Sequence, residues 1–523
     1  QPEPKVSAMS CFATPVRSAI NWAASRAISK GFAVGFSSGL VMFFSLFTHH
    51  NRGVSSVKKK QHIVIIGGGP GGYEAALAGI QLGAQVTLIE RNGVGGSAVL
   101  TDVVPSKALI ATAEAASAVR EATELGIRFK SGGKSVTPEI DIDFGAINQR
   151  LLDIAREQSR ELSANLTSQG VRIINGSGRL DGNHHVIATH ANGEEERIEA
   201  KTIIVAVGAH PRTLPGATPD GERILTWLDL YDLTELPEHM IVVGSGVTGA
   251  EFASAFSGLG CQVTLVSSRE TVLPSEDQDA AALIESVFKK NGMQVLSKAR
   301  AESAVNTGKG VEVHLADGRV IEGSHVLIAV GAIPNTAGLG LEEAGVELTE
   351  SGHIAVNRVA RTSRANVYAV GDCTNFLPLA SVSAMQGRTA VFHTMGDVAA
   401  PTQLRNVAAN VFTAPEIASV GWSQAAIEAG EVLGSIHKIM LEANPRAKMS
   451  NIEDGFIKVF ASTSGTVIGG VVVGPKASEL IYPIALAVEN RLTVDQVAKT
   501  FAVYPSLSGS ITEAARALHI PNV

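Results

Sequence analysis

Short apolar runs that end in glycine-rich turns recur along this chain. The clearest run, Ile63 to Ile66, passes through GGGPGG directly into a helix-forming stretch. A run of this kind is typical of a buried strand, and the abrupt change of period indicates a helix that starts at the turn. The same order recurs at residues 241–243, which GSGVTG follows. The pattern therefore predicts an α/β fold built from repeated strand–turn–helix units.

Three further apolar runs fit as strands of the same two units. Residues 202–208 (TIIVAVG) and 325–331 (HVLIAVG) both end in glycine and are followed by a proline, so we expect each run to close one unit. Residues 367–372 (VYAVGD) form another predicted strand, which ends in Asp372. Ligands collect at the carboxyl edge of open α/β sheets, so Asp372 is a candidate binding residue, with a buried structural aspartate as the alternative.

The chain from about residue 404 onward has a different pattern. Predicted strands at 455–459 and 467–473 alternate there with predicted helices at 478–490 and 494–500, and no glycine fingerprint occurs. This part is predicted to be a third, smaller α+β domain.

The first sixty residues do not fit this α/β pattern. Eight lysines and arginines against a single acid give residues 1–60 a net charge of +7, and residues 31–48 are uncharged and largely apolar. Four interpretations stay open: a membrane or signal anchor, an organellar transit peptide, a disordered tail, or a start assigned too far upstream. We expect residues 1–56 to lie outside the folded core. The protein is expected to be cytoplasmic, with membrane association only if residues 31–48 are a true anchor.

Composition narrows the function classes. The chain has 523 residues, a net charge of −7, 45% hydrophobic and 18% charged residues, which is typical of a globular protein of about three domains. The acidic balance argues against nucleic acid as a partner. The three cysteines, Cys11, Cys261 and Cys373, are too far apart to indicate a disulfide framework or a CxxC metal site. No metal site is predicted.

The first glycine-rich turn has the spacing of a dinucleotide site. Gly67, Gly69 and Gly72 form GxGxxG, in which the glycines permit a tight turn, a close pyrophosphate and close packing of helix on strand. Glu90 ends the next predicted strand, eighteen residues after Gly72, where a carboxylate can accept hydrogen bonds from ribose hydroxyls. This combination argues against a merely glycine-rich turn.

The second turn repeats the spacing but changes the residue at the end of the following strand. Its glycines are Gly244, Gly246 and Gly249. Eighteen residues after the last glycine stands Ser267, followed by Ser268 and Arg269, with no carboxylate to repel a 2′-phosphate. The site therefore favours NADPH over NADH by a modest margin. Arg269 could equally be a solvated surface charge, and Glu270 could reach the ribose instead.

The order of these motifs resembles the flavoprotein disulfide reductases, typified by dihydrolipoamide dehydrogenase and glutathione reductase. The resemblance covers residues 60 to 518 and includes the GG-x8-PSK segment at 95–107 and YPSLS near the C-terminus. It implies FAD in the first unit, NADPH or NADH in the second, and a homodimer formed through the third. The expected organisation is an N-terminal extension (1–56), a first FAD segment (57–209), an NAD(P) domain (210–335), a second FAD segment (336–402) and a dimerisation domain (403–523).

Two departures from the family pattern bear on the function. The family writes GGTCLNxGCxPSK, whereas this chain has GGSAVLTDVVPSK, so Ala98 and Val103 replace the two redox cysteines. The family's C-terminal HPTxxE reads here with Tyr504 and Gly509 in place of the histidine and glutamate. Both halves of the dithiol machinery are missing together. These details are most similar to an actinobacterial NAD(P)H:quinone reductase branch of the family.

The flavin half of the machinery is retained. The resemblance places Lys107 near the flavin N5, where it forms an ion pair with Glu251 that can steady developing charge. It also assigns Asp372 to the ribityl chain and Gly178 to the adenine. Gly331 ends the closing strand of the second unit and is assigned to its nucleotide site.

These features predict an FAD-dependent oxidoreductase that passes hydride from NAD(P)H to FAD and then directly to a quinone. Ala98, Val99, Val103 and Val104 would form an apolar wall for that acceptor. Tyr504 is a candidate to hydrogen-bond a quinone oxygen from the partner subunit, although a core tyrosine with a satisfied hydroxyl is more common. The alternatives are a pyridine nucleotide transhydrogenase, an NAD(P)H oxidase, or a non-catalytic flavin-bearing scaffold.

Overall fold

The computed structural model describes residues 61–132, 134–137 and 139–521. The expectations for the N-terminal extension, including residues 31–48, lie outside this part of the chain. Within the described ranges, no helix is both long and apolar enough to cross a membrane.

The first unit is built on a seven-stranded sheet in which five neighbouring strands are parallel. The sheet order is β19 (Val367–Ala369), β8 (Thr202–Val205), β1 (His62–Ile66), β2 (Gln85–Glu90), β5 (Arg172–Asp181), β6 (His185–His190) and β7 (Glu195–Glu199). The last two strands form an antiparallel extension that the apolar pattern did not predict. Because β19 follows the whole second unit in sequence, the chain returns to the first sheet to complete it.

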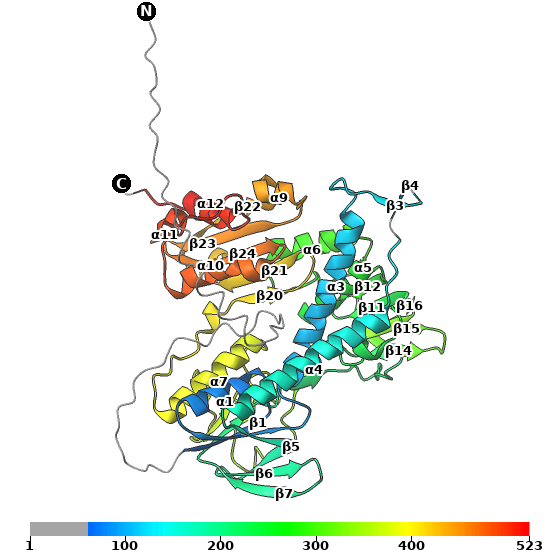
Figure 1. Cartoon of the computed structure of the whole chain (residues 1–523). Coiled ribbons are helices and arrows are strands. Elements are labelled where there is room, and N and C mark those ends of the chain that lie inside the picture. The colour runs from blue at the N-terminus through cyan, green and yellow to red at the C-terminus, as the bar shows by residue number, and fades with distance from the viewer. Residues whose placement is uncertain (1–60, 133, 138, 522–523) are drawn as a thin grey trace, which may run out of the picture. The chain divides into compact units, whose positions relative to one another are not determined.

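Close helix packing supports this sheet. Helices α1 (Pro70–Gln81) and α7 (Ala380–Met395) lie side by side (Figure 1). They can approach closely because Gly71 faces Gly387, where an added Cβ would overlap the Gly71 carbonyl oxygen. The other helices of this part are α2 (Gly96–Leu100), α3 (Val103–Glu121) and α4 (Phe144–Ser168), and a small hairpin joins β3 (Phe129–Ser131) to β4 (Lys134–Val136).

The second unit repeats the parallel core on a smaller scale. Its sheet order is β10 (Ile224–Leu225), β17 (His325–Ile328), β11 (His239–Val243), β12 (Gln262–Val266) and β13 (Gln294–Leu296). Helices α5 (Val247–Leu259) and α6 (Gln278–Lys290) belong to this unit, as does an antiparallel sheet of β14 (Ala301–Asn306), β15 (Val311–Leu315) and β16 (Val320–Gly323). The two connecting segments between the units pair as β9 (Ala209–Pro211) and β18 (Ala332–Pro334).

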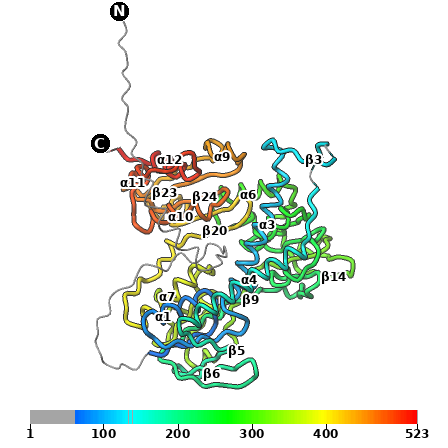
Figure 2. Tube along the Cα trace, in the orientation of Figure 1, coloured from blue at the N-terminus to red at the C-terminus, as the bar shows by residue number. Residues whose placement is uncertain are grey.

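The C-terminal part, coloured orange to red in Figure 2, is the predicted α+β domain. Its strands and helices end within a few residues of the expected positions. Its antiparallel sheet has the order β20 (Ala409–Val411), β21 (Glu416–Gly421), β24 (Val467–Gly474), β23 (Phe456–Ser462) and β22 (Gly434–Met440). Helices α10 (Ala477–Glu489), α11 (Val494–Lys499) and α12 (Gly509–Ala517) accompany it. Its core includes Ile457, Val472 and Ile484. The expected domain boundaries otherwise stay predictions.

Candidate active site

The two glycine-rich turns have the same backbone geometry. Gly67 and Gly244 adopt left-handed φ values of 102° and 116°, which side chains rarely tolerate. A Cβ on Gly67 would overlap the carbonyl oxygen of Ala206, and one on Gly244 would overlap that of Ala329. Likewise, a Cβ on Gly72 would overlap the carbonyl oxygen of Gly67, and one on Gly249 would overlap that of Gly244. Sterics therefore explain the first and third glycines of both fingerprints.

The middle glycine of each fingerprint leaves space for a ligand. Gly69 and Gly246 are the N-cap residues of α1 and α5, and both have an extended backbone. A Cβ added at either position would meet no described atom within 4 Å. The space beside each helix N-terminus is therefore open, and the exposed backbone N–H groups there favour a pyrophosphate.

The residues at the ends of β2 and β12 are bound differently. Glu90 accepts hydrogen bonds from the backbone N–H of Gly68 at 2.6 Å and of Asn92 at 2.8 Å. Ser267 stands at the matching place in the second unit, where it is fully buried and its Oγ lies 2.7 Å from Ser245 Oγ. The Ser267 hydroxyl is thus already satisfied within the protein. Position 267 can therefore affect nucleotide choice only because it carries no carboxylate.

Arg269 and Glu270 follow at the surface. The Arg269 side chain is exposed, while its backbone N–H donates to Ser267 Oγ at 3.1 Å. Glu270 forms an ion pair with Lys298 at 2.7 Å, and this hydrogen bond lowers the pKa of the Glu270 carboxyl. Arg269 is therefore the group more available to a nucleotide phosphate, and its role stays a prediction.

Lys107 and Glu251 form the expected ion pair. Lys107 lies in the first turns of α3 and Glu251 in α5, and their Nζ and Oε2 atoms are 2.7 Å apart. Glu251 is 5% exposed, and its other oxygen accepts a hydrogen bond from the backbone N–H of Phe412 at 2.9 Å. The Lys107 ammonium also lies 4.9 Å from the centre of the Phe412 ring. Three segments that are far apart in the sequence therefore fix the position of the Lys107 ammonium.

Two more carboxyls belong to this neighbourhood. Asp372 follows β19, and burial raises its pKa. Asp102 directly precedes α3; burial raises its pKa to about 6, the charges of Glu251 and Asp372 act in the same direction, and the charge of Lys107 acts against them. Asp102 was not among the residues predicted from the sequence. The available signal was a lone carboxylate inside the apolar stretch AVLTDVVP.

The positions that replace the family's cysteines are apolar in the structure as well. Ala98 lies in α2 and Val103 is the first residue of α3. Within the described ranges the cysteines are Cys261 and Cys373, both buried and not disulfide-bonded. Burial raises both thiol pKa values to about 12, so neither is a reactive thiolate at neutral pH.

The remaining predicted residues are spread over the molecule. Gly178 lies in β5, where an added Cβ would lie 3.1 Å from Ile66 and 3.2 Å from Ile89, at the carboxyl ends of β1 and β2. Gly331 has a φ of 103° and accepts a hydrogen bond from the backbone N–H of Arg212. Tyr504 is 83% exposed, which excludes the interpretation of a core tyrosine within this chain.

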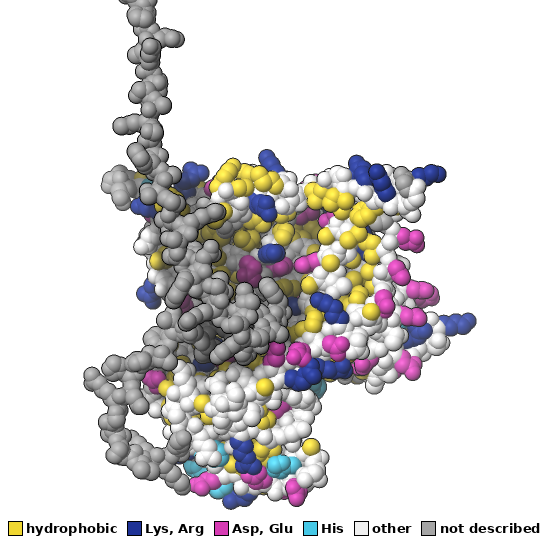
Figure 3. Space-filling view, viewed as in Figure 1, with side chains coloured by type: hydrophobic (Ala, Val, Ile, Leu, Met, Phe, Trp, Pro, Cys, Tyr) yellow, Lys and Arg dark blue, Asp and Glu magenta, His cyan; other side chains and the backbone are white. Residues whose placement is uncertain are grey.

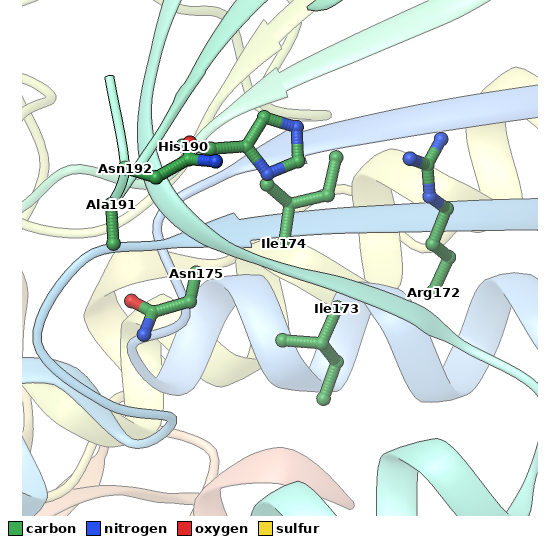
Figure 4. Close-up of a pocket in the computed structure, with 7 residues that line it drawn as sticks. All are labelled: Arg172, Ile173, Ile174, Asn175, His190, Ala191 and Asn192. Carbon is green, nitrogen blue, oxygen red and sulfur yellow. The ribbon is translucent and has the colours of Figure 1, made fainter. Parts of the chain in front are cut away.

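A cavity of about 330 Å³ lies at the edge of the first sheet (Figure 4). Arg172 and His190 line it, and both contact Glu196, which Arg172 holds through two hydrogen bonds of 2.7 Å. None of the predicted site residues lines this cavity, and the Arg172 charge is neutralised locally by Glu196. On the face shown in Figure 3, lysine and arginine side chains are dispersed among acidic ones, without a continuous basic area.

Comparison with known proteins gives consistent matches. Residues 61–387 match the model of pyridine nucleotide-disulphide oxidoreductases, and residues 407–515 match the dimerisation domain of the same group. The chain is 51% identical over 466 residues to an NAD(P)H dehydrogenase (quinone) of Mycobacterium tuberculosis, covering 87% of this chain and 93% of the relative. It is 32% identical over 468 residues to a dihydrolipoyl dehydrogenase of Zymomonas mobilis, covering 87% and 98%.

A solved structure agrees with the sequence matches. The crystal structure of LpdA from Mycobacterium tuberculosis superimposes with a TM-score of 0.84 at 50% identity, covering 88% of this chain and all of the other. These matches confirm the predicted fold of two nucleotide-binding domains followed by a dimerisation domain.

Proposed function

Because this chain belongs to the pyridine nucleotide-disulphide oxidoreductase family, we propose that it is an FAD-dependent NAD(P)H:quinone oxidoreductase that works without a redox disulfide. One observation carries the proposal: the Lys107–Glu251 pair is intact, whereas positions 98 and 103 hold no thiol. The name of the mycobacterial relative supports the quinone as acceptor.

The first unit fits FAD. The open space at Gly69 accommodates a pyrophosphate at the α1 N-terminus, and the Glu90 carboxylate at the β2 end can accept from ribose hydroxyls. Gly67 and Gly72 shape this turn, Gly178 would lie near the adenine, and Asp372 would bind the ribityl chain. Bound FAD supplies the electron relay between NAD(P)H and the acceptor.

Lys107 and Glu251 would act on that relay electrostatically. The Lys107 ammonium is held by Glu251, yet its side chain keeps 27% of its accessible surface, so it can face a ligand while it stays paired. A fixed positive charge stabilises negative charge that develops during hydride arrival, without reorganisation at that moment. Phe412 supports the arrangement because its backbone N–H holds the second oxygen of Glu251.

The second unit would bind NADPH at least as well as NADH. Gly244, Gly246 and Gly249 form the pyrophosphate turn, and Gly331 closes the neighbouring strand. The β12 end offers no carboxylate, and the exposed Arg269 can pair with a 2′-phosphate.

The acceptor would bind against the apolar segment that runs from α2 into the first turn of α3. Val99 is buried, and Ala98, Val103 and Val104 are partly buried, which suits a planar apolar oxidant. The match to the dimerisation domain supports a homodimer. In that homodimer the exposed Tyr504 of a second copy would reach this site. Gly509 has no side chain, so it cannot orient a proton donor at position 504 as the family's glutamate orients its histidine.

The test is a half-reaction assay on the purified protein. The yellow protein should bleach anaerobically when NADPH or NADH is added, and a soluble benzoquinone should restore the colour. Matched additions of a small disulfide should restore nothing. Recovery of the colour only with oxygen would indicate an oxidase, and recovery only with a second oxidised nucleotide would indicate a transhydrogenase. A protein that does not bleach at all would be a flavin-bearing scaffold. Each of these results would contradict the proposal.

A further inference from the structure

Asp102 places a carboxyl group in the apolar segment that would receive the acceptor. It lies between Thr101 and Val103, its backbone N–H donates to Ser97, and its carbonyl accepts from Ser106 at the start of α3. Within the described part of the chain its half-buried carboxyl makes no hydrogen bond, unlike Asp143, which caps the start of α4 with its side chain. The family pattern quoted above has glycine at this position.

Charged and titratable groups from four elements interact electrostatically with this carboxyl. Lys107 comes from α3, Glu251 from α5, Asp372 follows β19, and Tyr231 lies in a short 3₁₀ turn, Leu230–Asp232. Burial, with the two other carboxylates, outweighs the single ammonium, so the pKa of Asp102 rises to about 6. Asp102 can therefore hold or release a proton close to neutral pH.

The proposed reaction needs such a group. A quinone takes up two electrons and two protons, and a hydride supplies both electrons with only one hydrogen. The family's usual acid is missing, because Tyr504 and Gly509 replace the histidine and glutamate. Resting on the proposed function, we infer that Asp102 is the catalytic acid that protonates the reduced acceptor.

The hydroquinone forms by one hydride transfer and one proton transfer. One quinone oxygen receives the hydride hydrogen, and the other becomes a phenolate. The O–H bond of the Asp102 carboxyl breaks, and a new O–H bond forms on the phenolate, giving the hydroquinone. Asp102 is left as a carboxylate and regains its proton from water. NAD(P)H supplies both electrons, so no further reductant is needed.

The neighbouring groups are less suited to this step. Lys107 donates to Glu251 at 2.7 Å, and losing its proton would leave Glu251 as an unpaired buried charge. The Tyr231 hydroxyl is buried without a hydrogen-bond partner among the described residues, and burial raises its pKa well above the ordinary value. Of the carboxyls, Asp102 lies in the proposed acceptor wall itself.

The first test separates proton-dependent from proton-independent oxidation. Asp102→Asn should lower the rate at which a benzoquinone reoxidises the reduced protein by roughly a hundredfold, the usual contribution of a general acid. Reoxidation by ferricyanide, which takes electrons without protons, should change less than threefold. Asp102→Glu should recover part of the quinone rate, and Asp153→Asn, which removes an exposed carboxylate of α4, should match the parent.

A second readout does not depend on turnover. Folding raises the pKa of Asp102, so as pH rises the unfolded state loses this proton at a lower pH than the folded state does. The free energy of unfolding therefore falls as pH rises from about 4 to about 6. The unfolding temperature of Asp102→Asn should therefore exceed that of the parent at pH 8, and the difference should shrink towards pH 4. Asp153→Asn should show no such trend.

Two results would overturn the assignment. One is an equal loss of the quinone and ferricyanide rates, which would indicate a structural role. The other is an unfolding difference independent of pH, which would show that Asp102 has an ordinary pKa. Absence of quinone reduction in the parent protein would contradict the proposed function itself, and the unfolding readout would still report on Asp102.

Discussion

The two nucleotide-binding units follow one plan and differ where each meets its ligand. The first two strands of each parallel core pair in the same register. In each unit, Nε2 of a histidine at the start of the first strand lies 2.9 Å from Oγ1 of a threonine in the second strand. These pairs are His62 with Thr87 and His239 with Thr264. Their first and third glycines are required by the same steric contacts. The backbone frame is therefore common, and selectivity is left to a few side chains around it.

Those side chains come in matched pairs. In the first unit Gly68 and Glu90 face each other, and a Cβ on Gly68 would lie 3.1 Å from Glu90 Oε2. In the second unit Ser245 and Ser267 occupy the same places and contact each other through their hydroxyls. A glycine makes room for the long carboxylate, whereas a serine fits only a short partner. Changing one member alone should therefore not convert one unit into the other.

The largest effect should come from the turn glycines. Gly67→Ala should yield protein that retains no FAD, because the added methyl overlaps a carbonyl oxygen at a left-handed φ and costs at least about 3 kcal/mol. Gly244→Ala should stay yellow yet be reduced by NADPH more than a hundredfold more slowly. Flavin absorbance and stopped-flow reduction measure both.

Gly69→Ala is the matched control for the turn glycines. Its Cβ meets no described atom within 4 Å, so its fold should survive while its affinity for FAD falls. Equal behaviour of the Gly67 and Gly69 variants would show that the left-handed turn does not govern FAD binding.

The ion pair that links the units should give the next largest effect. Lys107→Ala should slow flavin reduction about a hundredfold with little change in KM, because the charge acts on the transition state. It should also destabilise the protein by about 3 kcal/mol, since Glu251 is left buried and unpaired. The double variant with Glu251→Gln should regain stability but not rate.

The pairing of Gly68 with Glu90 and of Ser245 with Ser267 predicts how the preference between NADPH and NADH can be switched. Ser267→Glu alone should impair both nucleotides, because the carboxylate would crowd the Ser245 side chain. Ser245→Gly with Ser267→Glu should favour NADH, shifting the kcat/KM ratio by about tenfold or more. Arg269→Ala should weaken NADPH use alone. A double variant with an unchanged ratio would show that this strand end does not read the ribose.

The smallest effect concerns acid stability of the second unit. Burial acts to raise the pKa of Asp220, but hydrogen bonds from backbone N–H groups and Asn306 outweigh it and lower the pKa to about 2. This contribution to stability is present above about pH 4 and is lost as pH falls towards 2. Asp220→Ala should cost about 1 kcal/mol at pH 7, reduced by solvent exposure, and much less at pH 2.5. Denaturant midpoints at the two pH values measure this difference.

Local patterns in the sequence determined much of the fold. Backbone requirements such as a left-handed turn permit few residue types, so both glycine fingerprints could be recognised from spacing. Buried strands likewise need continuous apolar runs, and these marked the strands of both units. The extension by β6 and β7 was missed because partly exposed strands lack such a run.

The site depended on tertiary structure for its decisive features. Lys107 and Glu251 were identified through family resemblance, but only folding brings residues 144 positions apart to 2.7 Å and adds the Phe412 N–H. Burial of Ser267 and the raised pKa of Asp102 arise from neighbours on other elements. Residue type sets what chemistry a side chain can offer, whereas its charge state and its partners depend on desolvation and long-range contacts, which no local pattern encodes.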